Sequence, residues 1–211
     1  RQSLLDNQIT RETAASAFGF NPNLKTVLVL GGSLGARTIN QTLAAGLALM
    51  KAHPEVQFIW QTGKIYIDQV KAAITAFTGE AVRNARVGSI PNLYVTDFIK
   101  NMNNAYTLAD LVISRAGAGS ISEFCLLGKP VILVPSPNVA EDHQTKNALA
   151  LVNKDAALYV KDAEAQEKLL DTALETVADD ELLKQLSINI AKLALPDSAR
   201  IIAEEVLKLI K

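Results

Sequence analysis

The chain has 211 residues, of which 49% are hydrophobic, and 21 Lys and Arg stand against 22 Asp and Glu. A chain of this length can bury roughly 70% of its unfolded surface, so it has room for a substantial core. The net charge of −1 argues against a protein that binds nucleic acid through a basic surface, because clustered Lys and Arg carry most of that affinity.

The single cysteine, Cys125, has no partner for an internal disulfide and offers no cysteine pair for a zinc site. We therefore expect a reducing, cytoplasmic setting. The apolar stretches reach only about six to nine residues, well short of the ~20 residues of a membrane-spanning helix. The polar opening RQSLLDNQITRE lacks a signal-peptide pattern and a starting Met, and we expect it to continue a longer upstream chain.

Short β-branched runs alternate with longer stretches of helical period after a polar linker segment, residues 1–25. Strands are predicted over residues 25–31, 56–63, 92–98, 110–114, 129–135 and 156–160. Helices are predicted over residues 36–52, 65–77, 101–109, 120–127 and 142–153, and from residues 163, 180 and 198. A looser stretch, residues 83–92, is expected to hold turns at Gly88 and Pro91.

The strands are almost continuously apolar, which predicts an α/β fold with a doubly wound parallel sheet covered by helices on both faces. Ligands of such sheets bind outside the carboxyl ends of the strands. Three turns at predicted strand ends have unusual compositions: GGSLGAR, SRAGAGSISE and VPSPNVAEDHQTKN.

The first turn allows two functional interpretations. Gly31 and Ser33 fall in a G-x-S-x-G pattern, the nucleophile elbow of hydrolases, and a triad would join Ser33 to Asp97 or Asp110 and to His143. Alternatively, the glycines let the backbone approach a phosphate, which the N–H groups of the following helix and the Ser33 hydroxyl bind. The turn matches neither the P-loop nor the G-x-G-x-x-G pattern, and a tight turn without a ligand is the third interpretation.

The second turn again places small residues, 116–120, between a strand and a helix. Ser120 and Glu123 have the spacing of a capping box, in which the glutamate returns to the helix start. Alternatively, the two oxygens of Glu123 accept hydrogen bonds from a sugar diol. Arg115 can pair with a phosphate or with a carboxylate of the scaffold.

In the third turn, His143, Gln144 and Asn147 stand where sugar or phosphate oxygens can be bound, although a solvated helix start at Asp142 explains the same polarity.

The last helix carries an apolar stripe of Ile202, Val206, Leu209 and Ile210. Such a stripe suits an interaction module that docks a partner. Packing on the chain's own domain or on a missing half explains the stripe more simply.

Two long runs, residues 27–43 (VLVLGGSLGARTINQTL) and residues 95–152, closely resemble the carboxyl-terminal half of the MurG family. These bacterial glycosyltransferases add N-acetylglucosamine to the undecaprenyl-linked muramyl-pentapeptide precursor of peptidoglycan. The resemblance implies a GT-B architecture, two Rossmann-like halves facing across a cleft. Residues 26–195 would form the half that binds UDP-N-acetylglucosamine, and residues 196–211 a helix that packs toward the other half.

The resemblance also implies roles for individual residues. Gly32 and Ser33 would contact the donor diphosphate, the Ile99 backbone would meet uracil, and Glu123 would bind the ribose hydroxyls. Further donor contacts are implied at Arg1, Arg115, Gly117, Ala118, Gly119, Ser120, Ile121 and Ser122, and contacts to N-acetylglucosamine at His143, Gln144 and Asn147.

By the same resemblance, the catalytic residues, the lipid I acceptor site and the membrane-binding patch would lie in the amino-terminal half. The complete protein would be peripheral on the cytoplasmic face of the bacterial inner membrane. This chain would bind the donor without transferring sugar, and neither a metal nor another cofactor is expected.

Overall fold

A computed structural model of the chain describes residues 8–32, 35–196 and 198–208. Its described strands form one sheet in the order β3-β4-β2-β1-β5-β6-β7. Every neighbouring pair is parallel except β3 and β4, which are antiparallel. The strands are β1 (Lys25–Leu30), β2 (Val56–Gln61), β3 (Arg86–Val87), β4 (Ile90–Thr96), β5 (Leu111–Ser114), β6 (Val131–Leu133) and β7 (Leu158–Tyr159).

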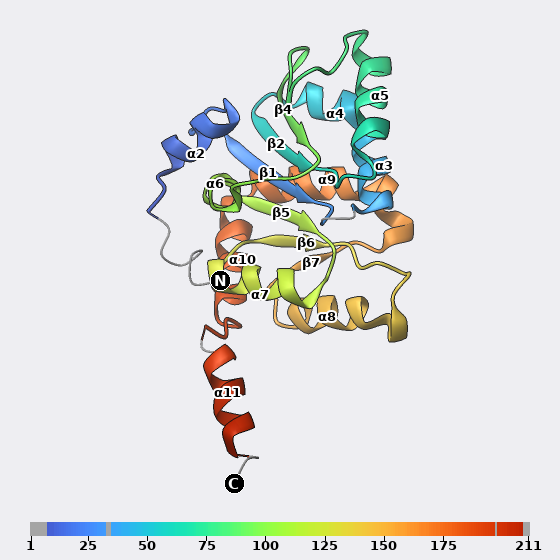
Figure 1. Cartoon of the computed structure of the whole chain (residues 1–211). Coiled ribbons are helices and arrows are strands. Elements are labelled where there is room, and N and C mark those ends of the chain that lie inside the picture. Colours follow the sequence, from blue (N-terminus) through green and yellow to red (C-terminus); the bar gives the residue numbers. More distant parts are fainter. Residues whose placement is uncertain (1–7, 33–34, 197, 209–211) are drawn as a thin grey trace.

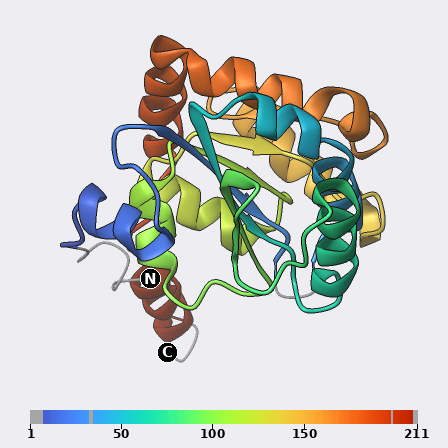
Figure 2. The same ribbon diagram turned by 90° about the horizontal axis from the view of Figure 1, so that it is seen from above.

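Helices cover both faces of this sheet, as Figures 1 and 2 show, and the predicted doubly wound α/β fold is confirmed. They are α2 (Arg11–Phe18), α3 (Arg37–Ala45), α4 (Leu47–Ala52), α5 (Ile67–Thr78), α6 (Met102–Leu108), α7 (Ala118–Leu127), α8 (His143–Val152), α9 (Ala165–Ala178), α10 (Asp180–Ala191) and α11 (Ser198–Lys208). Two short 3-10 turns, η1 (Ala140–Asp142) and η2 (Asp162–Glu164), precede α8 and α9.

The strands supply two separate cores because successive side chains point to opposite faces of the sheet. From β1, Val27 and Val29 enter the core beneath α3, α4, α5 and α9. Leu28 and Leu30 enter the other core, beneath α2, α6, α7 and α8. Burial on both faces explains why the strands read as continuous apolar runs.

The predicted helix over residues 36–52 is divided at Gly46 into α3 and α4. A Cβ atom at Gly46 would lie 1.9 Å from Cδ1 of Leu170, so the chain approaches α9 closely at this point. The apolar period continues through the break, and for this reason the sequence pattern does not show it.

Two elements lie where no regular structure was predicted. Helix α2 forms inside the predicted linker, begins after Thr10, whose side chain accepts a hydrogen bond from the backbone N–H of Thr13 (3.3 Å), and buries Ala14 and Phe18. The short strand β3 forms inside the looser stretch and pairs with β4.

Helix α11 extends away from the body of the molecule in Figure 1. Its Val206 and Leu207 side chains are 50% and 63% exposed. Leu209 and Ile210, also assigned to the apolar stripe, lie outside the described residues. No helix in the described part of the chain is both long and apolar enough to cross a bilayer.

Arg11 ties α2 to the amino-terminal edge of the sheet. Its guanidinium donates hydrogen bonds to the backbone carbonyls of Pro22 (2.7 Å), Leu24 (2.9 Å) and Leu108 (2.9 Å). It also pairs with the Asp110 carboxylate at 2.8 Å, and the same carboxylate oxygen accepts a backbone N–H of β1. Both side chains are largely buried, so this contact is worth more than an exposed ion pair.

Replacing Arg11 by Met is expected to lower the free energy of unfolding by about 2–4 kcal/mol, because Asp110 and three carbonyls lose a charged donor. Urea unfolding followed by circular dichroism measures the change. As a control, Lys168→Met breaks the exposed pair between Lys168 and Glu164 and should leave the midpoint almost unchanged. Equal shifts in the two variants would contradict the role given to Arg11.

Candidate functional site

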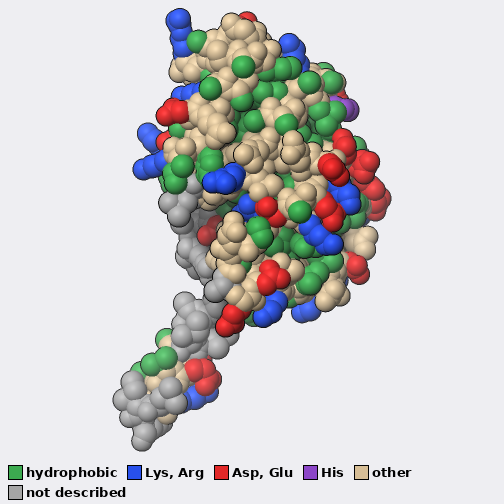
Figure 3. Space-filling model, turned by 90° about the vertical axis from the view of Figure 1, so that its right-hand side faces the viewer, with side chains coloured by type: hydrophobic (Ala, Val, Ile, Leu, Met, Phe, Trp, Pro, Cys, Tyr) green, Lys and Arg blue, Asp and Glu red, His purple; other side chains and the backbone are tan. Residues whose placement is uncertain are grey.

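The three turns of unusual composition lie together at the carboxyl edge of the sheet, as predicted. They follow β1, β5 and β6, which are neighbours in the sheet. The helices after β1 and β5 cover opposite faces, so a switch point of the topology lies between these strands, where doubly wound sheets bind ligands. Figure 3 looks onto this edge and shows basic and acidic side chains intermingled on it.

The first turn is held against the connection between β2 and α5. Gly31 is the first residue after β1, and its backbone N–H donates to the carbonyl oxygen of Gln61 (3.0 Å). Gly35 has φ +86°, and a Cβ atom there would lie 2.5 Å from the Thr62 carbonyl oxygen and 2.3 Å from Cδ2 of Tyr66. Only glycine fits this position, because it tolerates positive φ and has no side chain to clash.

Helix α3 begins directly after this turn and offers an uncapped N-terminus. Its N-cap residue, Ala36, makes no side-chain capping hydrogen bond. Such N–H groups, together with the positive end of the helix dipole, suit an anion. Ser33, the candidate nucleophile or phosphate contact, and Arg1 lie outside the described residues, so their roles stay predictions.

Gln61 joins the first turn to the loop after β4, and it was not among the predicted site residues. Its side-chain amide donates to the carbonyl oxygen of Gly32 (3.3 Å) and accepts the backbone N–H of Ile99 (3.1 Å). The glutamine is only 5% exposed, so the two hydrogen bonds take the place of bonds to water that its amide group loses on burial. The two backbone positions implied to meet diphosphate and uracil are therefore held by one side chain.

Arg115, after β5, is directed into the scaffold. One guanidinium nitrogen donates to the carbonyls of Val134 (3.0 Å) and Pro135 (3.1 Å) and pairs with the Asp162 carboxylate. The other oxygen of Asp162 accepts a hydrogen bond from the Thr38 hydroxyl on α3 (2.8 Å). Of the two partners considered for Arg115, the structure shows the scaffold carboxylate; a donor contact stays a prediction.

Helix α7 begins at Ala118, two residues before the predicted start, with Gly117 as its N-cap. The capping-box interpretation of Ser120 and Glu123 is wrong, because Ser120 lies inside the helix and a capping serine must precede it. Ala118 and Gly119 are exposed at this helix start, where no side chain provides a capping hydrogen bond.

Glu123 is bound instead to α6. Its Oε2 atom accepts a hydrogen bond from the hydroxyl of Tyr106 (3.0 Å). Burial, and secondarily the nearby carboxylate of Glu123, raises the pKa of Tyr106, so the phenol keeps its proton at physiological pH. The Oε1 atom of Glu123 makes no hydrogen bond with any described residue, and Glu123 is partly buried.

The third turn is tied to the other two by amide side chains. Gln144 accepts the backbone N–H of Ser136 (2.9 Å), and Asn147 donates to the carbonyl of Ala116 in the second turn (3.1 Å). His143 is exposed at the first residue of α8. Each predicted residue of this turn thus lies at the expected edge, and two of them fix its shape.

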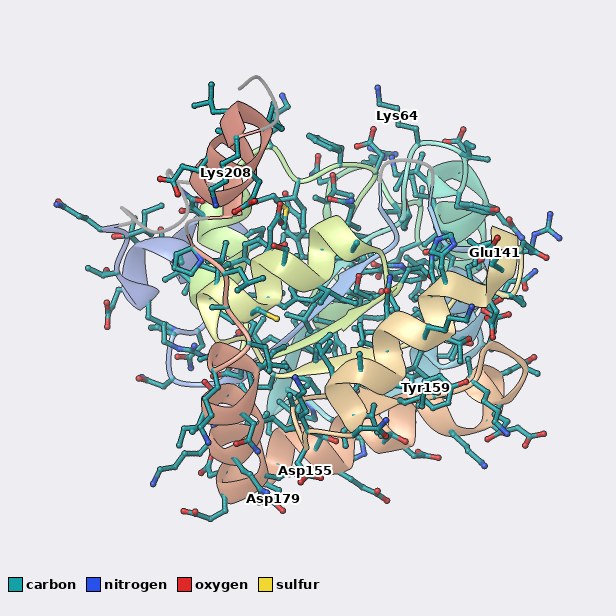
Figure 4. All side chains as sticks on the ribbon, turned by 90° about the horizontal axis from the view of Figure 1, so that it is seen from below. Lys64, Glu141, Asp155, Tyr159, Asp179 and Lys208 are labelled. Atoms are coloured by element: carbon teal, nitrogen blue, oxygen red, sulfur yellow. The ribbon has the colours of Figure 1, made fainter. Side chains whose placement is uncertain are left out.

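The start of α8 has unusual backbone geometry. Glu141 and Asp142 both adopt left-handed conformations, with φ of 54° and 50°, which cost non-glycine residues on the order of 1–3 kcal/mol each. Asp142 is the N-cap, as considered from sequence, but its carboxylate accepts from the Thr145 hydroxyl (2.6 Å) and caps no backbone N–H. Figure 4 shows Glu141 at the outer end of α8.

A cavity of about 380 Å³ lies where the first and third turns meet the connection after β2. Its lining includes Gly35, Arg37, Thr38, Tyr66, Arg115 and Gln144. Arg37 and Tyr66 were not predicted as site residues. Asn147, Ala118, Ile121 and Ser122 line a different cavity, of about 530 Å³, between α7, α8 and residues 192–195. Within the described chain, no three His, Cys, Asp or Glu residues are grouped so that they could hold a metal ion.

The hydrolase triad loses one of its proposed acids. Asp110 lies at the amino-terminal end of β5, at the opposite edge of the sheet from the turns, and is engaged by Arg11. Asp97 lies after β4 and accepts the backbone N–H of Phe98 (2.8 Å). The prediction that Asp110 is a partner of Ser33 is therefore wrong. Asp110 precedes β5, whereas the first turn follows the parallel strand β1, so the two lie at opposite ends of the strands.

Comparison with known sequences gives a consistent result. The profile of the family described as glycosyltransferase family 28 C-terminal domain matches residues 26–201. A Bacteroides fragilis protein is 68% identical over 209 residues, which are 99% of this chain and 52% of that protein. Its name is UDP-N-acetylglucosamine--N-acetylmuramyl-(pentapeptide) pyrophosphoryl-undecaprenol N-acetylglucosamine transferase, and a Cytophaga hutchinsonii protein of the same name is 45% identical over 210 residues (100% of this chain, 53% of that protein). The chain spans about half the length of the relatives it matches.

Solved structures share the fold. Acinetobacter baumannii MurG superposes with a TM-score of 0.73 at 24% identity, over 97% of this chain and 55% of that one. The UDP-GlcNAc 2-epimerase of Neisseria meningitidis, bound to UDP-GlcNAc, superposes with a TM-score of 0.66 at 16% identity, over 98% of this chain and 51% of that one.

The close approach at Gly35 can be tested against Gly32, which also has positive φ (+74°) but where an added Cβ atom would meet no other atom within 4 Å. Gly35→Ala is expected to cost about 3–5 kcal/mol of unfolding free energy, from backbone strain together with overlap of the new methyl group. Gly32→Ala should cost only the strain, about 1–2 kcal/mol. Chemical denaturation compares the two, and similar losses would show that the contact with Thr62 and Tyr66 does not constrain the turn.

Proposed function

The chain belongs to the glycosyltransferase family 28 C-terminal domains, and we propose that it binds the sugar-nucleotide donor of an N-acetylglucosaminyltransferase. The donor is UDP-N-acetylglucosamine, which the names of its relatives contain. The complete protein transfers N-acetylglucosamine to the undecaprenyl-linked muramyl-pentapeptide, lipid I, and so contributes to peptidoglycan synthesis.

One observation carries this proposal: two glycine-rich turns, each opening an uncapped helix, flank the switch point of the sheet. Backbone N–H groups at helix starts recognise phosphate oxygens without any motif-specific side chain. A cavity of about 380 Å³ beside the first of these turns offers space for part of such a ligand. Glu123, with one unengaged carboxylate oxygen among described contacts, adds the acceptor that a ribose diol needs.

The proposed arrangement follows the order of the turns. The diphosphate lies at the first turn with Gly32 and Ser33, uracil at the Ile99 backbone, and ribose at Glu123. The N-acetylglucosamine lies toward the third turn. The remaining donor contacts are Arg1, residues 117–122, His143, Gln144 and Asn147, with Arg115 acting through the loops that it holds.

In the proposed reaction, the oxygen of the C4 hydroxyl of the acceptor sugar attacks the anomeric carbon of the donor with inversion, and a base in the other half of the complete protein takes the hydroxyl proton. The bond from that carbon to the diphosphate oxygen breaks, and UDP leaves with the electron pair. This chain holds the donor in position and stabilises the negative charge that builds on the departing diphosphate. Backbone N–H groups and the exposed guanidinium of Arg37 at the start of α3 supply that stabilisation.

The other half of the relatives' length is proposed to supply the catalytic residues, the lipid I site and the contact with the membrane. The complete protein then works on the cytoplasmic face of the bacterial inner membrane. The reaction requires neither a metal nor another cofactor in this proposal. The isolated chain is expected to bind donor and to transfer no sugar.

Isothermal titration calorimetry with UDP and with UDP-N-acetylglucosamine tests donor binding. Glu123→Ala should weaken both ligands about tenfold to hundredfold, because hydrogen bonds to a charged group contribute about 1.5–3 kcal/mol. Asp171→Ala, at an exposed carboxylate on α9, is the matched control and should leave both affinities unchanged. Absence of binding by the folded chain would refute donor binding, and equal binding by the Glu123→Ala variant would refute the role given to Glu123.

A further inference from the structure

The hydrogen bond between Tyr106 and Glu123 joins two helices that follow different strands. Tyr106 lies on α6, after β4, and Glu123 lies on α7, after β5. The bond runs from the phenol hydroxyl to Oε2 at 3.0 Å and leaves Oε1 without a described partner. One oxygen of the carboxylate is therefore hydrogen-bonded within the protein, and the other is available to a ligand.

Tyr106 has little freedom to point elsewhere. Its side chain is 4% exposed, and its ring meets Phe124 edge to face, with centroids 6.3 Å apart and planes at 77°. A buried phenol hydroxyl needs an acceptor, and Glu123 is the one that this hydroxyl reaches. The position of the Tyr106 hydroxyl is thus set by packing in the core rather than by the carboxylate.

Without a residue that holds it in place, Glu123 would bind a diol weakly. A partly exposed glutamate has three rotatable side-chain bonds, and ordering it on binding costs free energy. A hydrogen bond from a fixed phenol removes much of that freedom before a ligand arrives. The remaining oxygen then presents a defined direction to a hydroxyl group.

We propose that Tyr106 is a positioning residue that orients Glu123 toward the ribose diol, so that the pair selects ribonucleotides over nucleotides that lack the diol. The inference rests on the proposed donor-binding function and adds to it a residue with no ligand contact of its own. A site built around a fixed acceptor rejects an analogue without the hydroxyl, because the analogue displaces water from the acceptor and offers no hydrogen bond in return.

Titration calorimetry with UDP and with 2′,3′-dideoxyuridine 5′-diphosphate tests the inference. The unmodified chain should bind UDP about tenfold more tightly than the dideoxy analogue. Tyr106→Phe removes one oxygen and keeps the ring, and should weaken UDP binding about threefold to tenfold while leaving binding of the analogue unchanged. The control is Tyr94→Phe, at a ring that packs edge to face on Phe18 with centroids 5.0 Å apart, and it should change neither affinity.

Two further comparisons separate orientation from general stability. In a Glu123→Ala background, Tyr106→Phe should have no additional effect on UDP binding, because coupled residues are not additive. Glu123→Asp keeps the charge but is one methylene shorter than the distance to Tyr106 requires, so its preference for UDP over the analogue should fall to that of Glu123→Ala. This second variant tests the inference even if Tyr106→Phe does not fold.

The outcomes distinguish the two levels of the proposal. If the folded chain binds neither nucleotide, the donor-binding function fails and the inference fails with it. If the chain binds UDP but Tyr106→Phe weakens both nucleotides equally, or if Glu123→Asp keeps the full preference, Tyr106 has no positioning role and donor binding stands.

Discussion

The placement of β1 between β2 and β5 is the constraint on which the rest of the site depends. β1 is parallel to both neighbours, so the turns that follow all three strands meet at one edge. The chain then leaves β1 and β5 toward opposite faces, which opens a crevice between the two following helices. No residue of the turns creates this geometry; the apolar strands impose it from within the core.

Most of the fold was predictable because its signal is distributed along the chain. Continuous apolar strands separated by helical stretches leave few alternatives to a parallel sheet covered on both faces. The missed elements have weak local signals: α2 lies in a polar segment and buries the small Ala14 and Ala15 beside Phe18, and β3 consists of two residues. The break at Gly46 reflects contact with Leu170, which is distant in sequence.

Only those parts of the candidate site that have a local sequence pattern within a single turn could be predicted. Glycines and polar helix starts predicted that three turns share one edge of the sheet, which the structure shows, but the residues that support these turns are distant in sequence. Gln61 reaches both Gly32 and Ile99, and no property of an isolated glutamine in an apolar strand indicates that use. The pattern of Ser120 and Glu123 was misinterpreted for the same reason, because local spacing does not show where a helix begins.

The bonds of Gln61 to the first turn and to the loop after β4 also bear on when the site comes into existence during folding. They connect residues 29 and 38 positions apart in sequence, so both bonds require the helices and strands between these residues to be in place. A nucleotide that recognises the finished edge therefore has no partial site to bind in the unfolded chain. By mass action, such a ligand stabilises the whole domain, by an amount that grows with the logarithm of its concentration.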